Sequence, residues 1–573
     1  MNSSPAAGSG LTTTQWLILT VAAIGFLFDT YELLLLPLIA APAIAELLQV
    51  PVSNPLVTAW VGRLLWIAAL CGGIFGLLGG WLTDRFGRKK VLALSIAVYS
   101  LSPVAAAFST SLPWFIFFRC ATFVGVCVEF VAAITWLAEL FPEKVRRERV
   151  LGWTQAFASV GGLFVTGVNG WILVHAAALP SLALPEPFNS HADWRYTLIT
   201  GLLPAILIAL LLPFVPESEV WLERRRTGTL RRPSFSELFS PALRRTTLVT
   251  AALSACAYGV AFGALQLTPT RIVPGLPDLA EQQTALTPLR VEAAQLNQLL
   301  NTNVNDRFVS AAAEVPGLRE LAGQRAKARI AIRATQTIVT NLNSPEVERT
   351  AAMVRLAGLT NSFAQLDTQL SQLTATKPDA KAVVMEREKI LGQLGANRTK
   401  QDRPDTIIKT RGKDVQFWQE LGGLLGRIAL AIGLALAVSR VGLLRFFVVP
   451  GLFVLPLTYY WLFRHEPLWF QWGVGVAGFL TVAQFSYFGE YLPKVFPVHL
   501  RGTGGSFATN VGGRMFGTSA AFLTTNLVAP YLLGGQTPAH VATAAAIVGT
   551  VMFALALGFS FLLPEPKADE SGH

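Results

Sequence analysis

Charged residues and cysteines are scarce in this chain. Of its 573 residues 14% are charged, whereas 52% are hydrophobic and the mean hydropathy is +0.48. A soluble domain carries about 25% charged residues, so the deficit argues against an ordinary soluble protein. The hydrophobic residues form repeated runs of about 20, the length with which an α-helix crosses a bilayer.

The four cysteines lie inside these apolar runs, without the spacing of metal ligands, at Cys71, Cys120, Cys127 and Cys256. We expect them to be buried packing residues that form no disulfide and bind no metal. The chain also lacks a Walker sequence and a nucleophile elbow, and its six histidines are scattered over loops, helix ends and the C-terminus. These absences argue against an ATP-driven pump and against an enzyme, and we expect no cofactor.

The net charge of +11 would suit a nucleic-acid-binding protein. Much of it, however, lies in short basic loops such as Arg85–Lys90, Lys144–Arg149 and Arg224–Arg245, which alternate with loops that have almost no Lys or Arg. The positive-inside rule places such basic loops in the cytoplasm. We therefore expect a multi-pass protein of the cytoplasmic (inner) membrane, with the lipid bilayer as its partner, no nucleic-acid partner and both termini in the cytoplasm.

The apolar runs predict an all-α membrane protein with twelve transmembrane helices in two halves of six. Phe141-Pro142 recurs as Phe496-Pro497, which supports a duplication of one half into the other. The predicted division is a cytoplasmic tail over 1–14, a first half over 15–215, a cytoplasmic loop over 216–245, helix 7 over 246–270, an extracytoplasmic insertion over 271–413, helices 8 to 12 over 414–563, and a cytoplasmic tail over 564–573.

One charged run stands between the second and third predicted helices, and it reads Gly80-Trp-Leu-Thr-Asp84-Arg85-Phe-Gly87-Arg88-Lys89-Lys90. Its spacing resembles the signature loop of major facilitator superfamily transporters. Arg85 and Gly87 recur at the same offset as Arg440 and Gly442 in the second half, where Ser439 replaces the acidic residue. The resemblance implies two six-helix repeats and transport by alternating access.

The same resemblance makes this loop a cytoplasmic gate that holds the two halves together. The residues expected in it are Gly80, Asp84, Arg85, Gly87, Arg88, Glu139, Arg146, Glu217 and, in the second half, Arg501. The alternative is that the basic residues only fix the topology, but this would not explain an acidic residue flanked by glycines.

Helix 1 contains Phe28-Asp29-Thr30-Tyr31-Glu32-Leu33, which is similar to the Asp-Gly-x-Asp element of proton-coupled aromatic-acid and sugar symporters. Helix 4 resembles the pattern of the same group at Arg119, Gly125 and Glu129. The chain departs from the group at Thr30, Phe123 and Cys127, where glycine is common. These departures bear on the substrate more than on the fold.

Four residues are candidates for proton coupling, because an uncompensated charge inside a bilayer costs at least ~3 kcal/mol. Asp29 and Glu32 are three residues apart and share a helix face. Arg119 is expected at a similar depth, so our leading hypothesis is an ion pair of Asp29 or Glu32 with Arg119 that alternates between conformations. The alternative is a fixed pair that only joins helices 1 and 4. Glu129 is either a second protonation site or a packing group.

A substrate cavity is expected along helix 8, where Glu420 and Arg427 share a face. Arg427 would either bind a substrate carboxylate or phosphate in bidentate fashion or pair with Glu420 or a carbonyl group. Further polar residues in apolar helices either line the cavity or form helix–helix hydrogen bonds, and they are Gln155, Gln266, Gln484, Tyr487 and Asn510.

The insertion over 271–413 is polar, and its apolar residues follow a heptad spacing. Leu356, Leu359, Phe363, Leu366, Leu370 and Leu373 form the clearest row. Asn343-Ser344-Pro345 supplies a helix stop, a cap and a first-turn proline, so we expect an antiparallel, coiled-coil-like hairpin. It would serve as an inert extension, as a lid, or as a docking module for a protein or cell-envelope partner.

These patterns together predict a secondary active transporter, a proton symporter of a small polar metabolite. Organic acids and sugars are the leading substrates, and the acidic pair of helix 1 favours a carboxylate. The alternative is a non-transporting sensor or receptor whose external helices bind a partner.

Overall fold

The computed structural model describes residues 12–563 apart from 51, 53, 141–143, 186–187, 215, 228–234, 341–345, 437–438 and 498–499. Within these ranges the regular structure is helical, and no β-strand occurs. The chain divides into two compact units. The first unit, called the membrane unit here, consists of Met1–Gln283 and Asp405–His573. The second, called the insert unit, consists of Thr284–Pro404.

Seven helices of the membrane unit are long and apolar enough to cross a bilayer. Four of them follow one another from the N-terminal side: α1 (Thr13–Leu48), α2 (Pro55–Phe86), α3 (Arg88–Ala107) and α4 (Leu112–Leu140). The other three come later in the chain: α10 (Arg244–Gly263), α16 (Arg440–Pro456) and α21 (Pro538–Ser560). Seven such helices indicate a multi-pass membrane protein.

The remaining five predicted spans also fall on helical segments. These are α5 (Lys144–His175), the broken run from α6 (Asp193–Ile199) through α7 (Leu203–Leu211), the last part of α15 (Pro378–Ala435), α18 (Pro467–Val495), and the run from α19 (Arg501–Ser506) to Leu532. The last of these contains two π-helical stretches, η11 (Phe507–Gly517) and η12 (Leu523–Leu532). The total of twelve transmembrane helices stays a prediction.

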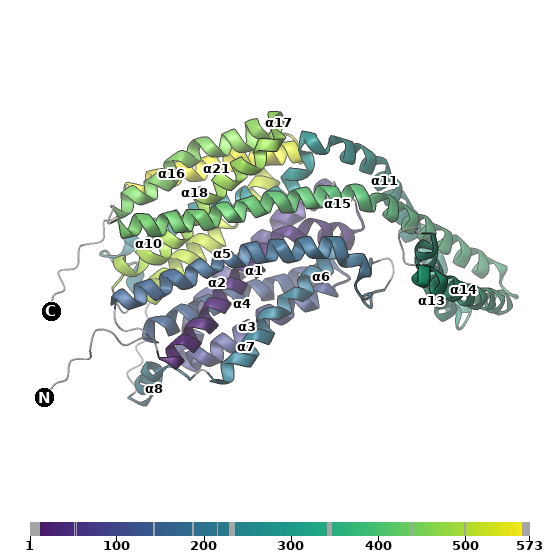
Figure 1. Cartoon of the computed structure of the whole chain (residues 1–573), viewed down its shortest axis with the longest axis horizontal. Coiled ribbons are helices and arrows are strands. Elements are labelled where there is room, and N and C mark those ends of the chain that lie inside the picture. The colour runs from purple at the N-terminus through teal and green to yellow at the C-terminus, as the bar shows by residue number, and fades with distance from the viewer. Residues whose placement is uncertain are drawn as a thin grey trace. The chain divides into compact units, whose positions relative to one another are not determined.

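Each half of the membrane unit is a bundle in which helices distant in sequence pack together. In the first half α1 contacts α4 and α5, and α3 contacts α4 (Figure 1). In the second half α10 contacts η11 and α21, and α16 contacts α21. Small residues permit this packing: a Cβ added to Gly422 of α15 would lie 1.9 Å from the carbonyl oxygen of Gly475 in α18. Only glycine allows the two backbones to approach so closely.

The turn between α2 and α3 depends on Gly87, which has φ of 98°. The Glu217 carboxylate accepts hydrogen bonds from the backbone N–H groups of Arg88 and Lys89, at 3.0 and 3.1 Å. An anion at the first turn of a helix is stabilised by these free N–H groups and by the helix dipole. A Cβ on Gly87 would lie 2.4 Å from Oε2 of Glu217, so glycine is required both by the backbone and by this contact.

In its described residues the insert unit has five α-helices and one π-helical stretch, η8 (Leu300–Val304). The α-helices are the larger part of α11 (Ala280–Leu299), α12 (Asn305–Glu314), α13 (Leu318–Thr340), α14 (Glu346–Leu373) and the first part of α15. Helices α13 and α14 are antiparallel neighbours, because Leu318 shares a buried cluster with Leu370 while Arg325 contacts Phe363. The residues of the predicted heptad row are buried or half-buried. Asn343-Ser344-Pro345 lies outside the described residues, and the extracytoplasmic position and the coiled-coil packing stay predictions.

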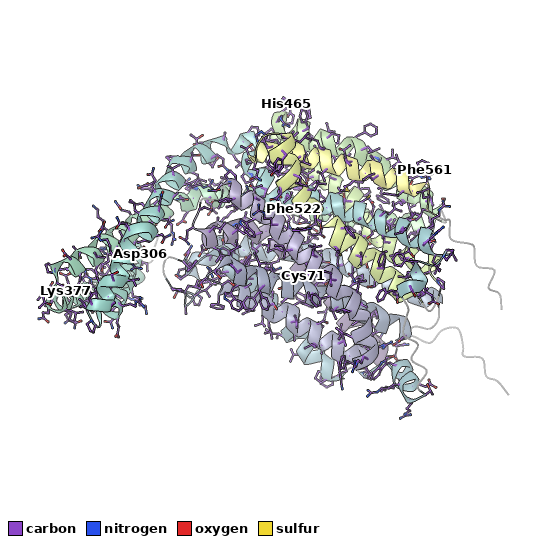
Figure 2. The ribbon with its side chains drawn as sticks, turned by 180° about the vertical axis from the view of Figure 1, so that it is seen from behind. Cys71, Asp306, Lys377, His465, Phe522 and Phe561 are labelled. Carbon is purple, nitrogen blue, oxygen red and sulfur yellow. The ribbon has the colours of Figure 1, made fainter. Side chains whose placement is uncertain are left out.

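A buried arginine holds the insert unit together. Arg325 is 1% exposed, and it donates to Glu388 through Nε at 2.9 Å and to Asp367 through Nη1 at 2.5 Å. Burial disfavours its charge, but the hydrogen bonds with Glu388 and Asp367 hold the pKa of Arg325 above its ordinary value. By contrast, the ion pairs of Lys377 and of Arg307 with nearby glutamates are exposed, and Lys377 is labelled in Figure 2.

Gly87→Ala should destabilise the membrane unit by about 1–3 kcal/mol, because the backbone strain and the lost Glu217 contact add up. The matched control is Gly442→Ala, where an added Cβ would meet only Ser439 at 3.5 Å. Thermal unfolding in detergent would measure both. Equal melting temperatures for the two variants would contradict this account of the turn.

Arg325→Ala should destabilise the insert unit by about 1–3 kcal/mol, because the buried Glu388 loses two hydrogen bonds from Arg325 and keeps only Arg329, 3.3 Å away, as its cation. Arg307→Ala removes an exposed pair and should cost no more than about 1 kcal/mol. Limited proteolysis of the full chain would show the difference as faster cleavage between residues 284 and 404 in the first variant only. A similar cleavage rate in both variants would refute a supporting role for Arg325.

Candidate functional site

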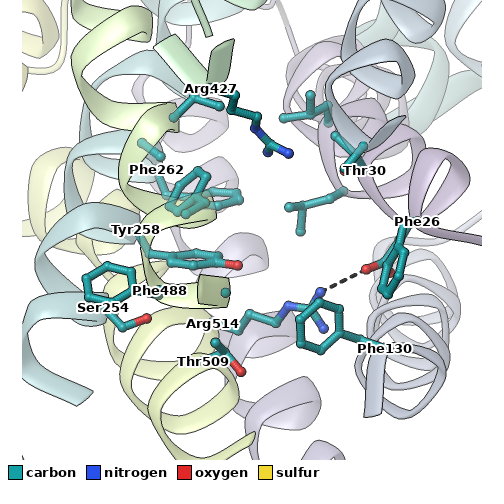
Figure 3. A pocket seen from close by; sticks show the side chains of 18 of the residues that line it. Phe26, Thr30, Phe130, Ser254, Tyr258, Phe262, Arg427, Phe488, Thr509 and Arg514 are labelled. Carbon is teal, nitrogen blue, oxygen red and sulfur yellow. Dashed lines mark hydrogen bonds and ion pairs between the residues drawn. The ribbon is translucent and has the colours of Figure 1, made fainter. Parts of the chain in front are cut away.

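A cavity of about 190 Å³ lies inside the membrane unit, with walls from both halves (Figure 3). The first half contributes residues of α1, α4 and α5, and the second half contributes residues of α10, η4 (Leu265–Leu267), α15, α18, α19 and η11. Phe26, Phe130, Tyr258, Phe262 and Phe488 give it aromatic walls. Its polar lining includes Asp29, Thr30, Ser254, Gln266, Gln419, Glu420, Arg427, Thr509 and Arg514.

An ion pair crosses this cavity from one half to the other. Nη2 of Arg514 donates to Oδ2 of Asp29 at 2.9 Å, drawn as the dashed line in Figure 3. The two side chains are 5% and 8% exposed. The guanidinium also lies over the Phe130 ring, at 4.8 Å from its centroid. Because the partners belong to α1 and η11, the pair joins the two halves in the low-dielectric centre of the membrane unit.

Glu129 of α4 lies beside this pair. Its side chain is fully buried, and neither carboxyl oxygen has a hydrogen-bond partner among the described residues. Asp29 and Arg514 are close enough to act on it electrostatically. A buried carboxyl group without a partner is costly when ionised, so such a group is suited to hold a proton.

The structure separates the two acidic residues of helix 1. Glu32 pairs with Arg119, whose Nη1 lies 3.6 Å from Oε2 of Glu32, and both side chains are buried away from the cavity lining. Asp29 instead faces Arg514. Positions three apart on an α-helix differ in direction by about 60°, enough for one to face the cavity and the other α4. Of the two pairings expected for Arg119, only that with Glu32 is present in this conformation.

Three of the predicted cavity residues line the cavity: Gln266, Glu420 and Arg427. Glu420 accepts a hydrogen bond from Nε2 of Gln419 at 3.0 Å. Three others are buried outside the lining, because their side chains bond or stack within their own helix. Gln484 donates to the carbonyl of Leu480, Tyr487 stacks on Tyr491, and Asn510 donates to Ser506.

Sequence reasoning missed Arg514 and Tyr258. Arg514 is a charged residue within an otherwise apolar predicted span, and this was a usable signal for a functional residue. Tyr258 carried no such signal, because an aromatic residue in a membrane helix is ordinary. Its place in the cavity depends on how α10 packs against the neighbouring helices.

A second polar cluster joins the ends of α3 and α4. Arg88 is 2% exposed and binds Glu139 in bidentate fashion, with distances of 3.0 Å from Nε and 2.7 Å from Nη2. The Ser218 hydroxyl donates to the same carboxylate at 2.6 Å. With the Glu217 contacts of the α2–α3 turn, the cluster ties the start of α3 and the end of α4 to the segment that follows the first half.

Other residues predicted for the gate are placed less fully. Arg85 is exposed and lies over the ring of Phe86. In the second half Arg440 pairs with Glu490 at 3.3 Å, also between the start of one helix and the end of another. The placements of Gly80 and of the side chains of Asp84, Arg146, Gln155 and Arg501 lie outside what the structure describes.

Part of the chain matches a known family of membrane proteins. Residues 19–291 match the family model described as Major Facilitator Superfamily. A crystal structure of a D-xylose–proton symporter has the same fold, with a TM-score of 0.51 and 16% identity over 97% of this chain and 99% of that one. The prediction of an all-helical transporter fold is thus confirmed. The match to the major facilitator superfamily covers a little under half of the chain.

Curated relatives match in part of their length. The niacin transporter NiaP of Acinetobacter baylyi is 28% identical over 211 residues, which are 37% of this chain and 43% of the relative. The cis,cis-muconate transport protein of the same organism is 29% identical over 187 residues, 32% of this chain and 41% of the relative. The chain therefore spans less than half the length of these relatives.

Arg514→Gln should destabilise the membrane unit by about 3–5 kcal/mol, because it leaves Asp29 buried without its cation. Adding Asp29→Asn should restore most of the loss, since the double variant buries two neutral groups. The melting temperature in detergent would be measured for each single variant and the double variant. Arg464→Gln is the control, because the hydrogen bonds of Arg464 go to Tyr460 and Thr543 rather than to a carboxylate. Simple addition of the two single losses would contradict a direct pair.

Proposed function

We propose that this protein is a proton-coupled symporter of a small polar metabolite, and that it works by alternating access. The observation that supports this most is the Asp29–Arg514 ion pair, which joins the two halves across the cavity beside the buried Glu129. A pair in this position has to change when the halves move relative to each other. Conformation and charge are therefore linked at one place.

The proton enters this scheme through the carboxyl groups. While Arg514 is bound to Asp29, the carboxylate is compensated and stays ionised. When the halves separate or a substrate takes the guanidinium, the carboxylate loses its cation in a low-dielectric site, and such a group gains a proton. Glu129 provides a second place for that proton, because it lies close to the pair and has no hydrogen-bond partner among the described residues.

For the substrate we propose an organic acid, with sugars as the alternative. Arg427 and Arg514 extend into the cavity from different walls, and Tyr258 and Phe262 lie between them in Figure 3. A guanidinium group binds a carboxylate through two parallel hydrogen bonds, and aromatic rings cover an apolar body. The relatives and the solved structure described above are named for niacin, cis,cis-muconate and D-xylose, so acids and a sugar are both represented.

The Arg88–Glu139 cluster and the adjoining loop with Asp84 are proposed as the cytoplasmic gate. Its residues tie the α2–α3 turn to α4 and to the segment before α8 (Glu219–Arg226), so that this end of the first half moves as one body. The cytoplasmic side of both termini, the inner membrane and the outer position of the insertion belong to the same proposal. They rest on the alternation of basic and uncharged loops.

The alternative of a non-transporting sensor has no observation in its favour, whereas the curated relatives described above are named as transport proteins. Counterflow of a labelled organic acid in proteoliposomes separates the two functions. A transporter exchanges labelled for unlabelled substrate without a driving force, and a sensor does not.

Asp29→Asn should abolish uptake driven by a pH gradient and leave counterflow largely intact, because the neutral amide can no longer load and release a proton. Both rates would be measured in proteoliposomes with and without an inward proton gradient. The matched control is Asp278→Asn, which removes an acidic residue that pairs with Arg411 outside the cavity. Proton-driven uptake that survives in the Asp29 variant would contradict coupling at this residue.

A further inference from the structure

A second ion pair joins the two halves, far from the cavity. It belongs to the part of α15 from Asp405 to Asp414, called the α15 stem here, which precedes the predicted eighth span. Lys409 of the stem forms an ion pair with Asp193, the first residue of α6 in the first half. Among the ion pairs of the membrane unit described above, this one and Asp29–Arg514 connect the halves.

The pair lies at the opposite end of the first half from the Arg88–Glu139 cluster. Helix α5 starts just after the end of α4, where Glu139 lies, and ends at His175, before Asp193. The stem and the part of α15 that follows it lie beside the later part of α5. A Cβ on Gly162 would lie 2.2 Å from Oε2 of Glu420, and one on Gly170 would lie 2.4 Å from Cδ of Lys413. The sequence topology makes this the extracytoplasmic end.

Three other contacts join the two halves at the same end of the bundle. Nη1 of Arg271 donates to the carbonyl of Val52 at 3.0 Å, and the Thr270 hydroxyl donates to that of Pro37 at 3.1 Å. Nδ2 of Asn526 donates to the carbonyl of Ala59 at 3.1 Å. In each case the donor belongs to the second half and the acceptor to the first. In this conformation the two halves are therefore closed on each other at this end.

The local charges favour an ionised Lys409. Its side chain is 32% exposed, and Asp405, one helical turn earlier, lies 3.1 Å from its amine. Partial burial disfavours the charged amine, but Asp193 and Asp405 together raise the pKa of Lys409 above its ordinary value. Asp193 is also held in place, because Oδ1 accepts a hydrogen bond from the Trp194 N–H at 2.7 Å.

We propose that Asp193 and Lys409 form an extracytoplasmic gate, which stabilises the conformation closed at this end and breaks when that end opens. The proposal rests on alternating access as proposed above, but it assigns residues outside the cavity and outside the cytoplasmic cluster. A partly exposed side-chain ion pair suits a gate, because water can hydrate both charges when the halves part, so that opening costs little.

The test measures opening directly by pulsed electron paramagnetic resonance. Spin labels would be attached to Ser181→Cys in the first half and His465→Cys in the second half, both exposed in loops or at helix ends, after the four native cysteines are replaced by alanine. Lys409→Gln and Asp193→Asn each remove the gate pair. Each should raise the ratio of the long to the short distance about fivefold, the effect of losing a partly exposed ion pair.

Three matched variants define the outcome. Asp405→Asn removes the carboxylate that pairs with Lys409 inside the same helix, and Lys413→Gln removes a nearby cation whose partner, Asp414, follows it in the chain. Neither should change the distance ratio by as much as twofold, and Lys409→Arg should keep the parent ratio. An equal rise in the Asp405 variant, or no rise in both gate variants, overturns the gate.

Counterflow measured on the same labelled protein separates this proposal from the proposed function. Distances that respond to Lys409→Gln and Asp193→Asn support the gate even if no tested organic acid is exchanged, and the failure then falls on the transport proposal. Normal counterflow with unchanged distances removes the gate and leaves transport standing. Because two independent variants break the pair, failure of one to fold leaves the other to decide.

Discussion

The Asp29–Arg514 ion pair joins the two halves of the protein where charge is most costly, and the proposed transport cycle depends on it. Removing two charges from water is tolerated only when they compensate each other, so a buried pair between the halves is favourable in one arrangement and unfavourable when the halves separate. This links the position of the halves to the charge state of the cavity. Glu129 is buried beside the pair and has no hydrogen-bond partner among the described residues, so its charge is costly in the same place.

The rest of the membrane unit supports that arrangement. Close packing through glycines such as Gly422 holds α15 against α18, and this brings Glu420 and Arg427 to the cavity wall. The buried Arg88–Glu139 bidentate pair fixes the α3 and α4 ends, and α4 carries Glu129. The Asp193–Lys409 pair acts at the opposite end of the same bundle. Each of these interactions is an ion pair or a close backbone contact. Such interactions hold helices together in a membrane, where no hydrophobic driving force acts between them.

The resemblance to the major facilitator superfamily and most of the helices could be predicted from sequence, because both depend on the local spacing of residues. The pattern of glycines and charges around Gly87 lies within a single turn. In the structure Gly87 has a positive φ and a close contact with Glu217, and both require glycine at this position. Asp29 and Arg427 could be singled out as charges within apolar runs, and both line the cavity. The partner of Asp29 could not be predicted, since 485 positions separate it from Arg514 and no periodicity connects them. For the same reason Gln484 and Asn510 were expected at the cavity but bond within their own helices.

The most direct test of coupled transport is a measurement of proton movement itself. Proteoliposomes containing the unmodified protein, with a pH-sensitive dye inside and no imposed gradient, would be given an inward gradient of an organic acid chosen by a counterflow screen. The account predicts that the interior acidifies as the substrate enters, that the acidification saturates with substrate concentration, and that an ionophore which collapses the pH difference increases substrate entry. Substrate entry without any protein-dependent change in internal pH would contradict proton coupling and, with it, the role given to Asp29 and Arg514.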